Sequence, residues 1–163
     1  ILPELNEYGK IYIANDNANG QVVLSGEISA IDYICANSKK FNIKRAIKLP
    51  VSAPFHSELI NSAATTLKNE VVNFHFKDFK YPLVSNVNAK PCSAENIQSL
   101  LVDQVVSRVR WREILEYMVD QNTTTFIEIG PGNVLTNLVK RMSRSANAIS
   151  ISKIEDLSKL KEI

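Results

Sequence analysis

A histidine that follows a proline-interrupted loop is the residue of this sequence best suited to chemistry. His56 ends the segment LPVSAPFH and directly precedes a helical pattern for which Ser57 is the expected N-cap. The positive end of a helix dipole disfavours an imidazolium, and a neutral imidazole can accept a proton from a hydroxyl nucleophile. The residues alone leave two interpretations open: a general base, or a histidine that only helps to cap the helix.

The sequence provides no obvious nucleophile for such a base. The segment GxSxG, which presents a serine on a sharp turn in many hydrolases, does not occur in the chain. Ser52 and Ser57 are near His56 in sequence, but so close a residue is poorly placed for activation by that ring. His75 stands between two phenylalanines in an alternating run, so we expect it to face solvent. A base at position 56 therefore needs a nucleophile from elsewhere.

Two loop segments resemble ligand-binding motifs but fail at decisive positions. Residues 15–20, NDNANG, lack the first Asp of a calcium loop, and Gly26 stands where its twelfth residue, Glu, is required. A dinucleotide fingerprint starting at 130–132, GPG, would need glycine at position 135, where the chain has leucine. The two cysteines and two histidines have no zinc-site spacing. We therefore expect no metal and no cofactor, and a tight strand-to-helix turn at 130–132.

The basic residues are scattered along the chain. It has 19 Lys and Arg against 17 Asp and Glu, a formal charge of +2, which argues against bulk nucleic acid as a partner. Three arginines around Trp111 do not make a stacking platform for bases. Lys140, Arg141 and Arg144 end a predicted helix, where cations are either solvated or hold a phosphate or an acidic partner. No membrane-length apolar run or signal-peptide pattern is present, so we expect no membrane partner and a cytoplasmic or organelle-interior chain.

Alternating strands and helices are predicted to position these residues. The 163 residues, 45% of them hydrophobic, are enough for a domain with its own core. Strands are expected over 10–14, 22–24, 44–49, 74–77, 83–87, 125–129 and 148–151. Helices are expected over 27–40, from about 57 to 71, and over 97–105, 114–119, 134–142 and 154–160. This order favours a mainly parallel sheet flanked by helices, preceded by a small β, β, α, β unit at 10–49.

Four separated motifs resemble one enzyme family. IANDNANGQVVLSG, LPVSAPFHSELI, SNVNAK and EIGPGNVLTNLVKR occur in an order and at distances similar to the later half of the malonyl-CoA:acyl carrier protein transacylases. The likeness extends from about residue 3 to residue 152. It implies an α/β fold with two parts. Residues 1–49 would form part of a small ferredoxin-like α+β subdomain, and residues 50–163 the C-terminal part of an α/β-hydrolase-like parallel-sheet core.

The resemblance implies a two-step acyl transfer in fatty acid synthesis. A serine attacks the thioester of malonyl-CoA, and the phosphopantetheine thiol of acyl carrier protein then takes the malonyl group from the serine. By the same resemblance, His56 is the catalytic histidine and Gln104 supplies a backbone carbonyl that orients it. Such a contact leaves the other ring nitrogen free to face the serine. The substrate is malonyl-CoA, and no cofactor is implied.

The resemblance also assigns residues to the substrate and the carrier protein. They are Asn15, Asn17, Gln21, Arg45, Val51, Phe55, Lys140 and Arg141. The three amides match a polar motif at the mouth of the cleft, and Val51 matches a loop beside the acyl chain. An aromatic ring at position 55 excludes an extra methyl group, which favours malonyl over methylmalonyl by about 1–3 kcal/mol. The three cations match positions that meet the phosphates of CoA or the acidic carrier protein.

In the family, three parts of the active site precede the region that this chain matches. They are the serine elbow, the glutamine loop of the oxyanion hole and the arginine that pairs with the malonyl carboxylate. We therefore expect this chain to be inactive alone and to need the N-terminal half of the same enzyme. Two alternatives stay open: a non-catalytic fragment or carrier-protein interaction module, and a polyketide-type acyltransferase with another acyl preference.

Overall fold

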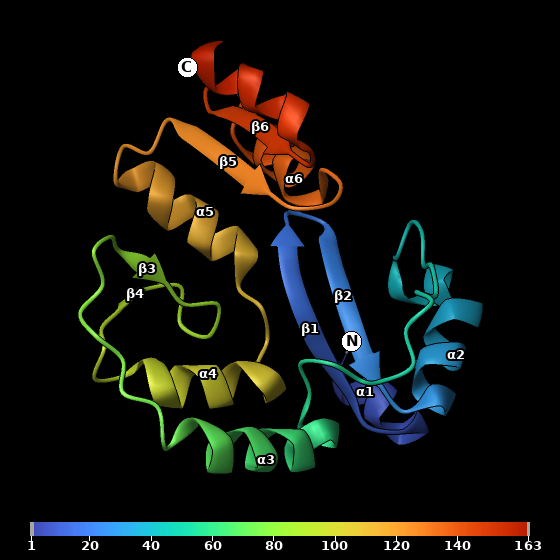
Figure 1. Ribbon diagram of the computed structural model, residues 1–163. Coiled ribbons are helices and arrows are strands. Elements are labelled where there is room, and N and C mark those ends of the chain that lie inside the picture. The colour runs from blue at the N-terminus through green and yellow to red at the C-terminus, as the bar shows by residue number, and fades with distance from the viewer. Residues whose placement is uncertain (1, 163) are drawn as a thin grey trace.

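The computed structural model describes residues 2–162 as a mixed α/β fold (Figure 1). Each sheet in this part of the chain has two strands. The antiparallel pairs are β1 (Ile11–Ala18) with β2 (Gln21–Gly26) and β3 (Leu83–Val84) with β4 (Pro91–Cys92), and the parallel pair is β5 (Thr125–Ile129) with β6 (Asn147–Ile151). The mainly parallel sheet expected from the sequence is thus represented, among the described residues, by the pair β5–β6.

Helices and helical turns occupy most of the remaining predicted positions. The α-helices are α1 (Leu2–Leu5), α2 (Ile28–Ala36), α3 (Asn61–Val71), α4 (Ile97–Val106), α5 (Trp111–Asp120) and α6 (Val134–Met142). The 3₁₀ segments are η1 (Asn6–Tyr8), η2 (Ser38–Phe41), η3 (Glu58–Ile60) and η4 (Ile154–Glu162). No helix in the described range is both long and apolar enough to cross a membrane.

Several predicted elements differ from the structure. No strand occurs over 74–77, and the strand expected over 83–87 is only the two residues of β3. The helix expected from about 57 is α-helical only from Asn61, and the one expected over 154–160 is 3₁₀.

The strand expected over 44–49 is wrong, because this stretch is irregular chain and runs beside no partner strand. Ile47 and Leu49 are exposed there, so their alternation does not reflect a buried face. The helix expected over 27–40 ends at Ala36, because the Asn37 side-chain amide donates to the carbonyl of Tyr33 at 2.9 Å and the chain continues as a 3₁₀ turn.

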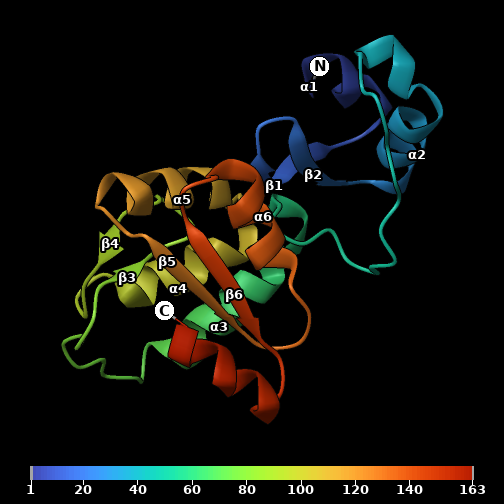
Figure 2. The same ribbon diagram turned by 90° about the horizontal axis from the view of Figure 1, so that it is seen from above.

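The N-terminal hairpin packs on α2 to form a first core. Leu5, Ile11, Ala30, Ile34 and Phe41 are buried together. Figure 2 shows α1, α2 and the hairpin on one side of the molecule, with β5, β6 and α5 on the other. The end of β2 lies so close to the start of β1 that a Cβ at position 26 would collide with the carbonyl of Lys10, which explains the glycine there. This close approach accompanies the pairing of Ile11 with Gly26, and the register then shifts twice along the hairpin, after Ile13 and after Asp16.

A second core lies where α5 and α6 pack against the parallel pair. Leu115, Val139 and Ala148 are buried there, and Trp111 and Phe126 pack around them. These residues come from α5, β5, α6 and β6, four elements at the C-terminal end of the chain. The two cores are separate clusters, and the hairpin meets the rest of the molecule where β1 packs against α5 and α6, with both buried alanines on β1 and polar contacts at the junction.

The extended segment 107–110 provides the backbone part of that junction. Val109 donates to the carbonyl of Ala14 at 2.8 Å, and its own carbonyl accepts from the amide of Asp16 at 2.9 Å. On its other side, the amide of Arg110 donates to the carbonyl of Asn86 at 3.1 Å. The segment therefore lies between β1 and the loop after β3, and it leads directly into α5.

The start of α6 is capped by a side chain from the preceding strand. Glu128 on β5 accepts hydrogen bonds from the amides of Leu135 at 3.1 Å and Thr136 at 2.8 Å. The turn between them needs Gly130 and Gly132, whose φ angles are 143° and 87°. The tight strand-to-helix turn expected at 130–132 is therefore confirmed. Burial raises the pKa of Glu128, but the hydrogen bonds from Thr136 and Leu135 outweigh it, so this pKa lies below its ordinary value.

Replacing Glu128 with glutamine is expected to destabilise the protein and to change its pH dependence. We predict that Glu128→Gln lowers the free energy of unfolding by about 1 kcal/mol, as for a lost helix cap. The stabilisation is complete above the usual glutamate pKa of about 4.3 and is lost as the pH falls through the lower folded-state pKa. Urea unfolding over a series of pH values measures this. Glu95→Gln, at an exposed carboxylate, is the control, and identical pH profiles for native protein and Glu128→Gln would contradict the cap.

Candidate functional site

The ring of His56 is held by the end of α4. Its Nδ1 lies 2.9 Å from the carbonyl oxygen of Gln104, across 48 residues of sequence. A helix leaves its last carbonyls without intrahelical partners, and α4 ends at Val106, so this oxygen is free to accept. Since a carbonyl only accepts, Nδ1 carries the hydrogen and Nε2 keeps the lone pair. The contact that the resemblance implied is present, and the catalytic role of the two residues stays a prediction.

The electrostatic environment of this ring differs from the one expected. Ser57 precedes η3, a three-residue 3₁₀ turn, and its side chain makes no cap hydrogen bond. The α-helix itself begins only at Asn61. The structure does not place His56 directly at the positive end of a helix, where the sequence predicted it. The ring contacts the carbonyl end of α4, which is the negative end of that helix. An imidazolium formed by proton transfer to Nε2 would have a carbonyl oxygen beside it.

The loop before the histidine is constrained, as its prolines predicted. His56 has a φ of 57°, a left-handed conformation that costs a non-glycine residue about 1 kcal/mol. Ser57 is 0% exposed, and its hydroxyl donates to the carbonyl of Pro54 at 2.5 Å. The amide of Phe55 donates to the carbonyl of Ala53 at 2.9 Å. These contacts hold the backbone in the conformation that brings the ring to Gln104.

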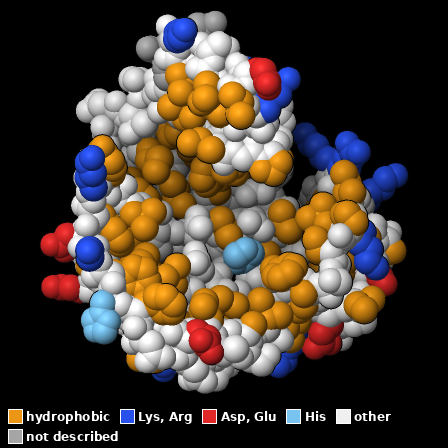
Figure 3. Space-filling model, viewed as in Figure 1, with side chains coloured by type: hydrophobic (Ala, Val, Ile, Leu, Met, Phe, Trp, Pro, Cys, Tyr) orange, Lys and Arg blue, Asp and Glu red, His pale blue; other side chains and the backbone are white. Residues whose placement is uncertain are grey.

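Hydrophobic side chains surround the hollow centre of the face that Figure 3 shows, and one of the two histidines lies there. Val51 and Phe55, predicted to lie beside the acyl chain, are exposed at 60% and 52%. Both belong to the loop that ends at His56. Their side chains are thus available to a ligand.

Two of the predicted substrate residues contact each other. Arg141 on α6 donates from Nη1 to the Oε1 of Gln21 at 2.7 Å, and from Nη2 to the carbonyl of Asn19 at 3.4 Å. The contact joins the tip of the hairpin to the C-terminal core. Because Arg141 already has these partners, a phosphate would have to share or displace them.

The other predicted contact residues are placed along the hairpin and on exposed segments. Asn15 and Asn17 are half-buried on β1. Arg45 and Lys140 are exposed, on the irregular chain after η2 and near the end of α6, respectively. Both cations are thus at the surface, where a charged partner can reach them.

A cavity beside the histidine turn was not foreseen from the sequence. It has a volume of about 460 Å³ and is lined by Lys10, Tyr12, Glu58, Leu59, Asn61 and Val106. The hydroxyl of Tyr12 donates to Glu58 at 3.4 Å across it. Desolvation and the nearby Glu58 carboxylate raise the pKa of Tyr12. No cluster of three or more metal-ligating side chains occurs in the part of the chain that the structure describes.

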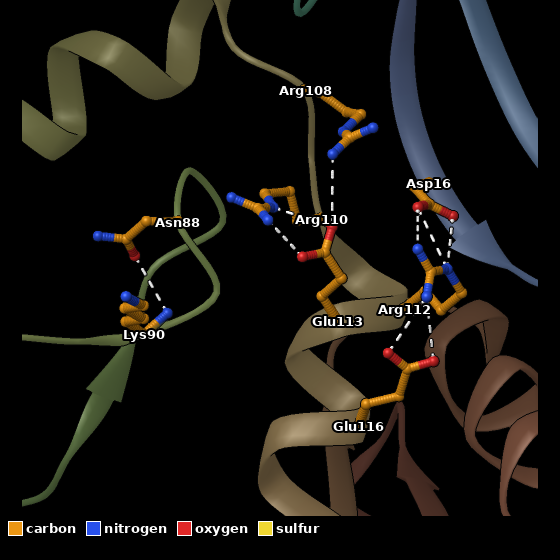
Figure 4. A network of polar contacts seen from close by, with 8 residues as sticks. All are labelled: Asp16, Asn88, Lys90, Arg108, Arg110, Arg112, Glu113 and Glu116. Carbon is orange, nitrogen blue, oxygen red and sulfur yellow. Dashed lines mark hydrogen bonds and ion pairs between the residues drawn. The ribbon is translucent and has the colours of Figure 1, made fainter.

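An ion-pair network next to the site was also missed (Figure 4). Arg112 pairs with Asp16 at 2.8 Å and with Glu116 at 3.1 Å, and Arg108 and Arg110 both pair with Glu113. The three arginines around Trp111 thus hold carboxylates of this chain.

The pairs shift the pKa values of the charged groups. Hydrogen bonds to Asp16 and then Glu116 raise the pKa of Arg112, and the hydrogen bond from Arg110 lowers the pKa of Glu113. Asp16 and Arg112 are 96 positions apart, so no local pattern signals their contact.

Comparison with known proteins gives one consistent family. The model of the acyl transferase domain matches residues 3–159. The chain is 39% identical to the malonyl CoA-acyl carrier protein transacylase of Bacillus subtilis over 148 aligned residues. The aligned region is 90% of this chain and 47% of that protein. The chain spans about half the length of the curated relatives it matches.

Solved structures agree in fold. An acyl-carrier-protein-S-malonyltransferase from Bartonella henselae superimposes with a TM-score of 0.91 at 40% identity, over 99% of this chain and 52% of that one. A malonyl-transacylase in complex with a type II PKS acyl-carrier protein has a TM-score of 0.92 at 33% identity, over 99% of this chain and 53% of that one.

Ser57 provides a test of how the histidine is held. We predict that Ser57→Ala lowers the free energy of unfolding by about 1–3 kcal/mol, because the hydrogen bond from the buried Ser57 hydroxyl to the half-buried carbonyl of Pro54 is lost. It should also weaken the His56 hydrogen bond, seen as faster solvent exchange of the Nδ1 proton by NMR. Ser52→Ala, at an exposed serine of the same loop, is the matched control. Equal effects of the two substitutions would contradict a specific role for the Ser57 hydroxyl.

Proposed function

The chain belongs to the acyl transferase domain family, and on that premise we propose that it forms the C-terminal part of a malonyl-CoA:acyl carrier protein transacylase. The observation that carries the proposal is the contact of 2.9 Å between His56 Nδ1 and the Gln104 carbonyl. It leaves Nε2 as a proton acceptor in a half-buried position. The names of the relatives supply the substrate, malonyl-CoA, and the acceptor, acyl carrier protein.

In the proposed reaction, His56 accepts a proton from the attacking group and then gives it to the leaving group, once in each half of the transfer. Nε2 takes the proton of a serine hydroxyl, and the serine oxygen attacks the thioester carbonyl of malonyl-CoA. The thiolate of CoA leaves and receives that proton. In the second half, the carrier protein's thiol gives its proton to Nε2 and attacks the serine ester, and the serine oxygen takes the proton back.

We propose that the serine lies outside these residues, in keeping with the share of the relatives that the chain covers. Ser57 is unsuited to the role, because its hydroxyl is buried and donates to Pro54. The malonyl carboxylate would then also be bound from outside this chain. The N-terminal half of the same enzyme is the partner that supplies both groups.

The hairpin and the exposed cations would contribute substrate contacts. Asn15, Asn17 and Gln21 would bind the polar arm of the CoA or carrier thioester, and Arg45, Lys140 and Arg141 its phosphates or the acidic carrier. The exposure of Arg45 and Lys140 supports this role. A structural neighbour that is itself in complex with an acyl-carrier protein supports the carrier as a partner.

The finer architecture is part of the proposal. Residues 50–163 would complete an α/β-hydrolase-like parallel sheet, and residues 1–49 would belong to a ferredoxin-like subdomain. Ile127 and Ile129 on β5 are 45% and 84% exposed, and strands of parallel sheets are normally covered on both faces. Further strands and helices of the same enzyme would cover them. We place the whole enzyme in the cytoplasm or an organelle interior.

Two alternative functions, a polyketide-type acyltransferase and a non-catalytic interaction module, can be distinguished from the proposed transacylase by experiment. The malonyl-transacylase whose structure contains a type II PKS acyl-carrier protein makes a polyketide-type acyltransferase the second candidate. A non-catalytic interaction module would bind carrier protein without forming an acyl enzyme. Mass spectrometry of the complete polypeptide after mixing with malonyl-CoA detects the malonylated serine that the transacylase requires.

Removal of the proposed base should abolish most of the transfer. In the complete polypeptide that contains this chain, we predict that His56→Ala lowers kcat by about 10²–10⁴-fold, the usual contribution of a general base. His75→Ala, at an exposed histidine, should leave kcat unchanged. Transfer of radiolabelled malonyl from malonyl-CoA to carrier protein is the assay. Full activity of His56→Ala would refute the proposed role.

Phe55 is predicted to select the acyl group. Phe55→Ala should raise the kcat/KM for methylmalonyl-CoA relative to malonyl-CoA by about tenfold or more, because one methyl group is worth about 1–3 kcal/mol in such a pocket. Phe74→Ala, at another exposed phenylalanine, is the control. Competition between the two thioesters measures the ratio. An unchanged ratio would remove Phe55 from the acyl pocket, and preferred transfer of methylmalonyl by the native enzyme would favour the polyketide-type alternative.

A further inference from the structure

The ion pair between Asp16 and Arg112 connects the hairpin with the elements that hold the histidine. Asp16 lies on β1, and Arg112 lies in the first turn of α5, shortly after Gln104 in the chain. We propose that this pair positions the Gln104 carbonyl against His56, so that Asp16 and Arg112 are positioning residues for the acyl transfer. The inference rests on the proposed function and adds residues to its machinery.

The geometry of the pair is suited to fixing an orientation. The Nη2 of Arg112 lies 2.8 Å from Oδ2 of Asp16, and its Nε lies 3.2 Å from both carboxylate oxygens. Asp16 is 9% exposed, so water competes little for its oxygens. A planar guanidinium held at two nitrogens by one carboxylate cannot rotate without breaking a hydrogen bond. The pair therefore sets the direction of α5 relative to β1 as well as its distance.

The backbone transmits this placement to α4. Val109 is bonded to Ala14 and Asp16 on β1, and α5 begins shortly after it. On the other side, the amide of Ser107 donates to Asp103 in the last turn of α4 at 2.9 Å. Gln104 lies in that same turn. A shift of α5 away from β1 would therefore act on the carbonyl that holds the histidine.

The other ion pairs of the network do not make this connection. Arg108 and Arg110 pair with Glu113, and Glu116 lies one turn after Arg112 on the same helix. These contacts stay within 108–116 and cannot fix this segment relative to β1. Figure 4 shows Asp16 reaching Arg112 from the strand, while the other carboxylates come from α5. Glu116 thus offers a control that acts on the same arginine.

The test compares two carboxylate substitutions in the complete polypeptide that contains this chain. Asp16→Asn should lower kcat by about 10-fold to 100-fold, because small displacements of a catalytic group have effects of this size. The KM for malonyl-CoA should change little, since the substrate contacts are kept. Glu116→Gln should retain native kcat, and Asp16→Glu should recover part of the loss by restoring the charge. All variants are assayed below their own thermal midpoints.

A spectroscopic measurement makes the test independent of turnover. In ¹⁵N-labelled protein, the Nδ1 proton of His56 should give a slowly exchanging signal in the native enzyme and in Glu116→Gln. The signal should be lost or broadened in Asp16→Asn, while circular dichroism confirms that the variant is folded. If the native polypeptide transfers no malonyl, the proposed function fails, yet this signal still tests the positioning.

Three results would overturn the inference. The first is an Asp16→Asn variant with native kcat and a native Nδ1 signal, even if its thermal midpoint is lower. The second is an increase in KM at constant kcat, which would assign the pair to substrate binding on β1. The third is an equal loss of kcat in Glu116→Gln, which would show that any change at Arg112 suffices.

Discussion

The hydrogen bond between His56 and the end of α4 is the contact on which the candidate site depends. It exists because a helix leaves its final carbonyls without partners, and because the chain after Val106 turns away and leaves the Gln104 oxygen free. In the neutral ring, the same bond places the hydrogen on Nδ1 and leaves the lone pair on Nε2. A left-handed backbone at position 56, held by the buried Ser57 hydroxyl, brings the ring to that oxygen. The strained backbone at His56 and the bond from Ser57 thus both serve one contact, the hydrogen bond to the Gln104 carbonyl oxygen.

The rest of the molecule divides into parts that provide stability and parts that provide geometry. Two separate apolar clusters, one under the hairpin and one between α5, α6 and the parallel strands, supply burial that has no preferred direction. Directional polar contacts join them. These are the backbone bonds of Val109, the Asp16–Arg112 pair and the contact from Arg141 to Gln21. These hydrogen bonds, together with the packing of β1 against α5 and α6, set the relative placement of the two clusters.

Elements with a strong local pattern could be predicted from the sequence. The helix over 134–142 and the strands over 125–129 and 148–151 were recognised because apolar period, glycines and β-branched residues agree there. The strand over 44–49 was wrong for a physical reason. A strand is stable only beside another strand, and alternation in a single segment does not reveal whether a partner exists. The cap of α6 by Glu128 also went unnoticed, since it acts across the turn.

For the site, the sequence by itself determined the constrained loop before His56, and the family resemblance pointed to the Gln104 carbonyl. Tertiary structure decided which charged or polar groups surround the His56 ring. The nearest helix in sequence suggested a positive end, but the neighbour in space is the carbonyl end of a helix 48 positions away. It also decided that Arg112 meets Asp16 across 96 positions and that Arg141 meets Gln21 across 120. Local patterns record the conformations that neighbouring residues impose on one another, whereas charge pairing between distant segments arises only after the chain has packed.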